Sequence, residues 1–115
     1  MKACNTRNKK IVSSNVIVAE RLLERMRGLL GKRGLENGES LLIKPCKGVH
    51  TLGMRFPIDV IFLDSGNNIL NMRENMPPNR ISSLSLRTSM VLELQAGTIS
   101  LAETRIGDRI IFELP

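Results

Sequence analysis

Short apolar runs separated by turn-forming residues dominate the chain. The clearest run covers residues 58–63, in which Asp59 is the only polar residue, and it predicts a strand buried on both faces. Residues 64–68 read DSGNN and predict a turn, after which residues 69–72 return as the partner strand of a hairpin. Further strands are predicted over residues 10–19, where the pattern suits a small hairpin, and over residues 41–43, 90–94 and 109–114.

One segment changes to a helical period. Apolar residues from Glu20 to Leu30 follow helical spacing, and Gly31 is positioned to end the helix. We expect this helix to pack on the sheet through four side chains, Leu22, Leu23, Met26 and Leu30. Residues 97–103 suit one or two helical turns. The pattern therefore predicts a mainly β (α+β) fold, a compact barrel-like or sandwich-like and mostly antiparallel sheet with one or two short helices.

The length of 115 residues suits one hydrophobic core rather than two. Residues 1–8 are polar and basic and are expected to form a flexible N-terminal tail, and residues 9–115 a single globular domain. No apolar run approaches the roughly 20 residues that span a bilayer, and no signal peptide is visible, so we expect a cytoplasmic monomer. Cys4 and Cys46 are too few for a disulfide framework and are expected to be free thiols.

The formal net charge of +6 is unevenly distributed. Residues 1–55 hold twelve Lys and Arg against four Asp and Glu, whereas residues 56–115 hold five against seven. The first group includes a predicted basic patch formed by Arg21, Arg25, Lys32 and Arg33. The chain lacks Trp and Tyr, and its three Phe lie in apolar contexts, so stacking platforms for nucleic-acid bases are not expected. A solvated basic face is the simpler interpretation, and nucleic-acid binding remains an alternative.

Candidate chemistry concentrates around the only histidine. Cys46, His50 and Met54 are spaced at intervals of four, and their side chains are soft ligands of the kind that copper(I) prefers. Glycines at 48 and 53 interrupt any regular element, and a closed zinc site needs four ligands, so we expect no metal and no cofactor. A thiol- or histidine-dependent enzyme that uses Cys46, His50 and Asp59 is the second alternative. Residues this close in sequence rarely form such a catalytic pair.

Asp59 is expected to be buried, because it shares one side of its strand with Ile61 and Leu63. A buried carboxylate needs a partner. The candidates are Arg55, His50 and the backbone amides of residues 46–54. Either Asp59 orders this loop, or the loop forms one wall of a pocket in which His50, Thr51 and Arg55 face a ligand.

Three segments carry a resemblance to a known family. They are residues 46–64 (CKGVHTLGMRFPIDVIFLD), residues 25–31 (RMRGLLG) and residues 91–97 (VLELQAG), the last followed by Ile106, Gly107 and Asp108. In this order they resemble the bacterial and archaeal family catalogued as domain of unknown function 192. The adjacent His50 and Thr51 resemble one branch of the family, whereas Gly53 stands where many members carry an aromatic residue.

This resemblance implies a compact, mainly β fold but no established activity. Some members are encoded near pilus or secretion genes, which suggests an accessory role with such machinery. Taken with the residues, we expect a non-enzymatic binding or accessory module that recognises a peptide, a partner protein or a small anion. The candidate ligand-binding residues are Cys46, His50, Thr51, Met54, Arg55 and Asp59.

Overall fold

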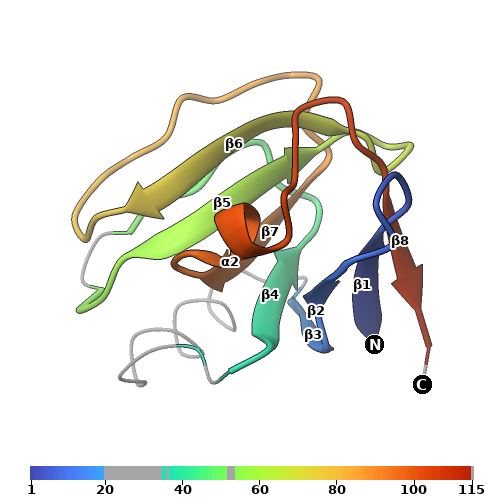
Figure 1. The fold of residues 1–115 in the computed structure, drawn as a ribbon. Helices are drawn as coiled ribbons and strands as arrows, with labels where there is room; N and C mark the ends of the chain where they lie inside the picture. The colour runs from blue at the N-terminus through green and yellow to red at the C-terminus, as the bar shows by residue number, and fades with distance from the viewer. Residues whose placement is uncertain (20–34, 36, 52–53, 115) are drawn as a thin grey trace.

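Two β-sheets pack against each other in the computed structural model, which describes residues 1–19, 35, 37–51 and 54–114 (Figure 1). The three-stranded sheet has the order β2-β1-β8, with β1 at Lys2–Asn5, β2 at Ile11–Ser13 and β8 at Ile110–Glu113. The five-stranded sheet has the order β3-β4-β7-β5-β6. Its strands are β3 (Asn15–Ala19), β4 (Glu39–Ile43), β5 (Ile58–Leu63), β6 (Ile69–Met76) and β7 (Met90–Gln95).

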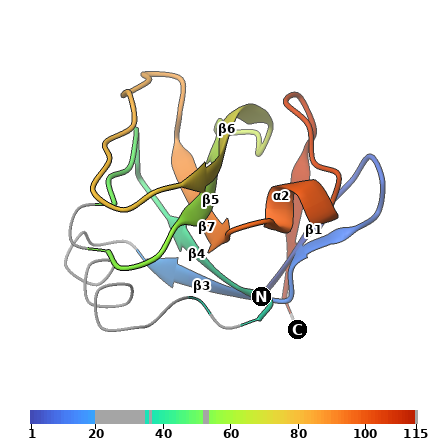
Figure 2. The ribbon, with the colours of Figure 1, turned by 60° about the vertical axis from the view of Figure 1, so that its left-hand side comes forward.

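Strand pairing is antiparallel throughout both sheets except between β3 and β4, which run parallel. The helix α2, at Thr98–Leu101, follows β7 directly. Figure 2 shows α2 at the border between the two sheets, where Ile99 of the helix and Ala102 directly after it join the core. The predicted fold class is therefore confirmed as mainly β, mostly antiparallel and sandwich-like.

Apolar side chains form two cores, one on each face of the five-stranded sheet. The inner core lies between the sheets, because it joins Ala3, Val12 and Ile110 of the small sheet to side chains of the large one. The outer core covers the opposite face and includes Met54, Val60 and Phe62. Every residue of β5 is buried, which confirms that this strand is covered on both faces.

The β5–β6 hairpin forms where it was predicted, and β6 extends four residues beyond the expected end, to Met76. Its turn is held by Asp64, whose Oδ1 accepts the backbone N–H groups of Gly66 and Asn68, both at 2.9 Å. Asn67 adopts the left-handed conformation with φ 66°, which asparagine tolerates in turns. The strands predicted over 41–43, 90–94 and 109–114 are confirmed as β4, β7 and β8, and the helical turn over 97–103 as α2.

The chain start departs from the prediction. Residues 2–5, expected in a flexible tail, form β1 at the centre of the three-stranded sheet, with Ala3 and Asn5 fully buried. The polar composition of residues 1–8 does not prevent burial, because the side chain of Asn5 has a hydrogen-bond partner inside the protein. Its Nδ2 donates to Asp108 Oδ2 at 2.7 Å.

The hairpin predicted over residues 10–19 is also wrong. β2 and β3 belong to different sheets, and the chain crosses between them at Ser14. The crossing is fixed by the Gly38 carbonyl oxygen, which accepts the N–H groups of Ser14 at 3.0 Å and Asn15 at 3.1 Å. The helix predicted over residues 20–30 lies outside the described residues, as does the basic patch at Arg21, Arg25, Lys32 and Arg33. Among the described residues, no helix has the length and apolar character needed to cross a membrane.

Candidate functional site

Asp59 is fully buried, as predicted, but its partners are not those predicted. One carboxylate oxygen accepts the N–H of Asn75 at 2.8 Å, and the other accepts the N–H groups of Gly97 at 3.1 Å and Ile99 at 2.9 Å. These amides come from the end of β6 and the start of α2, whereas Arg55, His50 and the loop over residues 46–54 were expected. The reason is that Asp59 points to the inner-core face, while this loop packs on the outer core through Val49 and Met54.

The Asp59 carboxylate thus caps α2 from another strand. The helix has no side-chain cap of its own, because its N-cap residue is Gly97, with φ 95°. Unpaired amides at a helix start favour a negative charge. Asp59 therefore orders the junction between β7 and α2.

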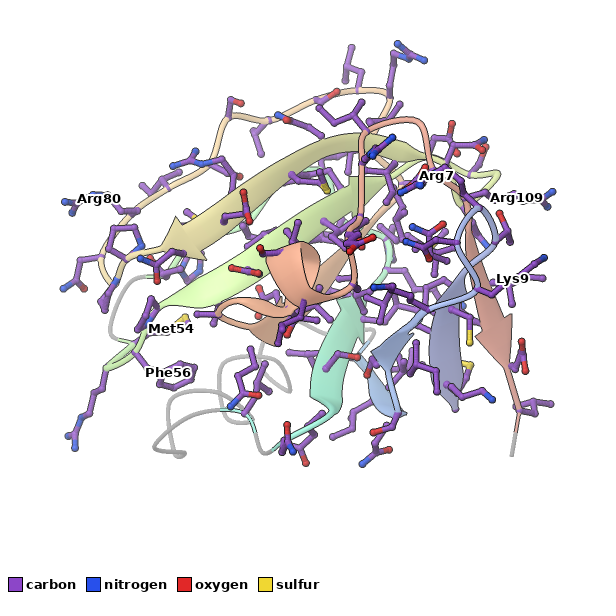
Figure 3. The ribbon with its side chains drawn as sticks, in the orientation of Figure 1. Arg7, Lys9, Met54, Phe56, Arg80 and Arg109 are labelled. Atoms are coloured by element: carbon purple, nitrogen blue, oxygen red, sulfur yellow. The ribbon has the colours of Figure 1, made fainter. Side chains whose placement is uncertain are left out.

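Thr51 and Met54 are structural parts of the loop. The Thr51 side chain is fully buried, donates to the carbonyl oxygen of Pro77 at 2.7 Å and accepts the N–H of Arg80 at 2.8 Å. Met54 belongs to the outer core, and Figure 3 shows it beside Phe56 at the start of β5. Both side chains are committed to packing or to backbone hydrogen bonds.

Cys46, His50 and Arg55 do not converge on Asp59. The half-buried Cys46 thiol donates to the Gly48 carbonyl oxygen at 2.8 Å, half-buried His50 forms a β-bridge with Ile81, and Arg55 is exposed. Because Asp59 faces the other side of the sheet, the structure does not assemble a Cys46–His50–Asp59 constellation. Within the described part of the chain, no three His, Cys, Asp or Glu side chains lie close enough to hold a metal ion.

The loop over residues 46–50 supports a second segment, residues 81–89, which runs alongside it. Ser82 and Ser85 donate their N–H groups to the carbonyl oxygens of Val49 at 2.9 Å and Lys47 at 3.1 Å. Gly48 permits this close approach, because a Cβ there would lie 2.8 Å from a side-chain carbon of Leu84 and 3.0 Å from the Ser83 carbonyl oxygen. Hydrogen bonds and packing from the loop over residues 46–50 therefore fix the path of residues 81–89.

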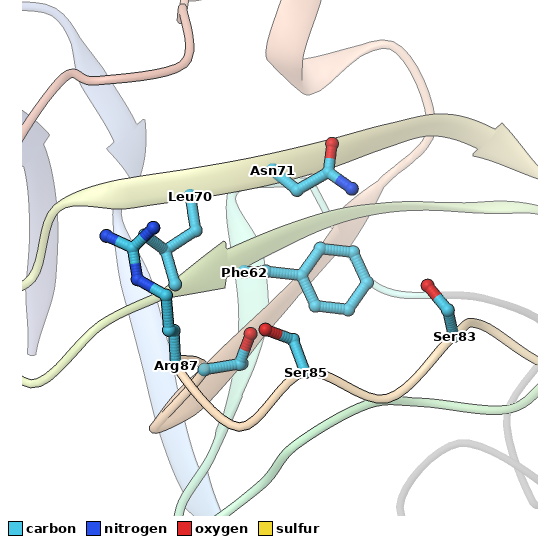
Figure 4. Close-up of a pocket in the computed structure, with 7 residues that line it drawn as sticks. Phe62, Leu70, Asn71, Ser83, Ser85 and Arg87 are labelled. Atoms are coloured by element: carbon cyan, nitrogen blue, oxygen red, sulfur yellow. The ribbon is translucent and has the colours of Figure 1, made fainter.

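A pocket of about 250 Å³ lies between residues 83–88 and the β5–β6 hairpin (Figure 4). Its apolar base is the ring of Phe62, which is only 5% exposed. Figure 4 shows this ring between Asn71 of β6 and Ser83 and Ser85 of the facing segment, with Arg87 beside Leu70. Thr88 completes the lining.

The polar groups of this pocket are largely uncommitted. Within the described residues, neither the Arg87 guanidinium nor the Ser83 and Ser85 hydroxyl groups make a hydrogen bond or an ion pair. Asn71 uses its Oδ1 to accept the N–H of Met72 at 2.9 Å, which leaves its amide nitrogen as a donor. The pocket therefore offers one positive charge and several hydrogen-bond donors above an aromatic ring.

The positive charge of Arg87 acts on one acidic group, Asp64, without a direct contact. Backbone N–H donation from Asn68 is the main cause that lowers the pKa of Asp64, and the positive charge of Arg87 lowers it further. Asp64 is already occupied by the turn amides of Gly66 and Asn68. Within the described residues the Arg87 guanidinium forms no ion pair with Asp64 or another carboxylate, so its hydrogen-bond donors are available to an anion.

Two features of the structure were missed by the sequence analysis. Glu93 is a second fully buried carboxylate, and it lies on the outer-core face because β7 pairs it with Val60 and Leu41. The pocket was also missed, because residues 81–88 match neither a regular strand nor a helix. Alternation of serine and leucine over residues 83–86 is the one signal that this segment combines polar and apolar side chains.

A family model supports the resemblance noted from the motifs. The model of DUF192, described as "Uncharacterized ACR", matches residues 3–112. No curated protein matches the chain.

Two solved structures share the fold. A protein of unknown function from Novosphingobium aromaticivorans DSM 12444 superposes with a TM-score of 0.80 at 19% identity, covering 96% of this chain and 82% of that one. A putative transcription regulator from Sinorhizobium meliloti 1021 superposes with a TM-score of 0.76 at 22% identity, covering 96% of this chain and 89% of that one. At these identities the similarity concerns the fold alone.

Proposed function

The chain belongs to the DUF192 family, which is described as uncharacterised, and from this premise we propose that it is a non-enzymatic binding module for a small anionic group. The ligand occupies the pocket between Phe62 and Arg87. One observation carries the proposal: a guanidinium without an ion-pair partner in the described structure lines the same cavity as a buried aromatic ring.

The lining of the pocket defines the chemistry of the ligand. Arg87 supplies charge-assisted hydrogen bonds, which are stronger than neutral ones, and Ser83 and Ser85 add neutral donors. Phe62 and Leu70 favour a planar or apolar body next to the charge. The volume of about 250 Å³ lies below the roughly 300–1,000 Å³ of pockets for drug-sized molecules. A carboxylate attached to a small ring or aliphatic group fits this description best.

Binding rather than catalysis is supported by the lining residues. The pocket is lined by no His, Cys, Asp or Glu among the described residues, so its serine hydroxyl groups have no general base beside them. The enzyme alternative loses support for the same reason, because Cys46, His50 and Asp59 have separate structural partners. Nucleic-acid binding also gains no support: the Sinorhizobium meliloti neighbour is described as a putative transcription regulator, but a likeness at 22% identity extends to the fold alone.

Benzoate is a suitable probe, with benzamide as its neutral counterpart. In ¹⁵N-resolved NMR titrations we expect benzoate to shift the backbone amides of the pocket residues in a saturable manner and to bind at least five-fold more tightly than benzamide. Arg87→Gln should weaken benzoate binding about ten-fold, or about 1.4 kcal/mol, and should remove the preference over benzamide. Lys9→Gln removes the same charge from the exposed β1–β2 connection and should change neither affinity.

Three results contradict the proposal. Benzoate binding that does not saturate, equal affinity for benzoate and benzamide in the parent protein, or full affinity in Arg87→Gln would each exclude an anion site at Arg87. The control matters because a general effect of net charge would weaken binding equally in Lys9→Gln.

A further inference from the structure

Three large apolar side chains are exposed on the same segment that walls the pocket. Ile81 is 70% exposed, Leu84 79% and Leu86 91%. Ser83, Ser85 and Arg87, which line the pocket, stand before, between and after the two leucines. We call residues 83–87 the ridge, because they carry pocket-lining side chains next to exposed leucines. A turn at Leu86 and Arg87, closed by the N–H of Thr88 donating to the Ser85 carbonyl oxygen at 3.2 Å, ends the ridge. Several exposed apolar side chains on one short segment are a feature of interaction surfaces.

A second positive charge lies against this ridge. The Lys47 ammonium donates to the carbonyl oxygen of Leu86 at 3.0 Å, next to Arg87 in the chain. The two leucines are therefore accompanied by one cation from the supporting loop and one from the pocket. This combination complements an occupant that carries negative charge beside apolar groups.

We infer that the occupant is a polypeptide, whose carboxylate enters the pocket at Arg87 while its neighbouring apolar side chains cover Leu84 and Leu86. The inference rests on the proposed function and extends it, because a free small acid would fill the pocket and leave both leucines in water. An anionic membrane fits less well. Attraction to such a surface takes clusters of about four to eight Lys and Arg, whereas residues 56–115, which include the pocket, hold five basic and seven acidic residues.

The test uses labelled synthetic heptapeptide pools and fluorescence anisotropy. The acidic pool is acetylated and amidated, has Asp or Glu at its centre, and carries Leu, Ile, Val or Phe on both sides. The neutral pool has Asn or Gln at the centre. A third pool has the neutral centre and a free C-terminal carboxylate, so that a side-chain carboxylate and a chain terminus are distinguished.

We expect the parent protein to bind one of the two carboxylate pools at least ten-fold more tightly than the neutral pool. The double variant Leu84→Ser/Leu86→Ser should lose at least ten-fold in peptide affinity while it keeps the benzoate affinity of the parent. The matched control is Leu101→Ser/Leu114→Ser, which removes two leucines of similar exposure, 82% and 84%, outside the ridge. This control should bind all peptides normally.

Failure of this inference is distinguishable from failure of the proposed function. If benzoate binds through Arg87 but the carboxylate pools bind no better than the neutral pool, or the double variant keeps full peptide affinity, the polypeptide partner is rejected and the anion site stands. If benzoate does not bind, the proposed function itself fails. Sedimentation with phosphatidylserine vesicles that depends on Leu84 and Leu86, without peptide binding, would overturn the polypeptide in favour of a lipid surface.

Discussion

Charged groups on the two sides of β5 differ in their hydrogen-bond partners. On the inner face, the Asp59 carboxylate is fully buried and accepts three backbone N–H groups, at 2.8, 2.9 and 3.1 Å. On the outer face, Phe62 forms the base of a pocket in which the Arg87 guanidinium has no hydrogen-bond partner among the described residues. Asp59 and Phe62 are three residues apart in β5.

The contrast separates a charge that builds the fold from one that is available to a ligand. A buried charge is retained only when its hydrogen bonds are made within the protein, so Asp59 joins β5 to β6 and α2. A charge at an open pocket keeps its hydrogen-bonding capacity for a partner. Substitution of Asp59 should therefore change mainly stability, whereas substitution of Arg87 should change mainly ligand binding.

Asp59→Asn should have the largest effect on stability. The substituted amide can still accept one N–H through its oxygen, but its NH₂ group would face the N–H donors of Gly97 and Ile99, and these would lose their acceptor. We expect the free energy of unfolding to fall by about 3 kcal/mol, because hydrogen bonds to charged groups contribute about 1.5–3 kcal/mol each. Urea denaturation followed by circular dichroism measures this change.

The matched control for this variant is Asp64→Asn. Asp64 also accepts backbone N–H groups, but it does so in the surface turn between β5 and β6, where asparagine supports the same turn. Its unfolding midpoint should move much less than that of Asp59→Asn. Equal shifts in the two variants would mean that burial of Asp59 contributes nothing specific.

Asp108 is another buried carboxylate, and its hydrogen bonds connect segments from the two ends of the chain. Its carboxylate accepts hydrogen bonds from Arg7 Nε at 2.7 Å, from Asn5 Nδ2 at 2.7 Å and from the N–H of Arg105 at 2.8 Å, which ties β1 to the start of β8. These contacts, the Arg7 hydrogen bond first, lower the pKa of Asp108 to about 2. Asp108→Asn should reduce the free energy of unfolding by about 2 kcal/mol at pH 7.

The lowered pKa of Asp108 predicts the direction in which pH changes the free energy of unfolding. In the unfolded chain an aspartate has a pKa of about 3.9, so the folded protein binds fewer protons between that value and its own pKa of about 2. The contribution of Asp108 is complete above about pH 5 and is lost as the pH falls through 3.9 towards 2. Asp108→Asn should therefore lose less stability than the parent protein between pH 5 and pH 3. Parallel losses in the two proteins would show that other carboxylates control the acid response.

Strand positions could be predicted from the sequence because burial leaves a pattern in neighbouring residues. The run over residues 58–63 is apolar on both sides, and the structure buries it between two cores. The turn over residues 64–68 is equally local, because Asp64 bonds to amides two and four residues ahead. By contrast, β1 was missed because its inward polar residue, Asn5, is satisfied by Asp108, which is 103 residues away.

The roles of the residues in the candidate site were harder to predict, because they also depend on contacts between residues far apart in the sequence. Residues 46–54 contain the most chemically distinctive side chains, but most of their described interactions hold the loop and residues 77–89 in place. The partners of Asp59 are backbone amides, which any residue could supply, so no residue type in the sequence marks them. The pocket is lined by Phe62 and Arg87 from two different segments, and neither position has a motif. Spacing along the chain identified a family and a buried carboxylate, and tertiary contacts decided what each residue does.

Arg87→Gln should have the smallest effect on stability and is the sharpest test of the contrast. The side chain is exposed and makes no hydrogen bond or ion pair within the described structure, so the free energy of unfolding should stay within about 0.5 kcal/mol of the parent value. The difference should appear only with ligand present. Benzoate at ten times its dissociation constant stabilises a one-site protein by about 1.4 kcal/mol. Thermal denaturation with and without benzoate should show this gain in the parent protein and in Asp59→Asn, and little of it in Arg87→Gln. If Arg87→Gln unfolds as readily as Asp59→Asn in the absence of benzoate, then Arg87 is part of the scaffold and the division between the two faces of β5 does not hold.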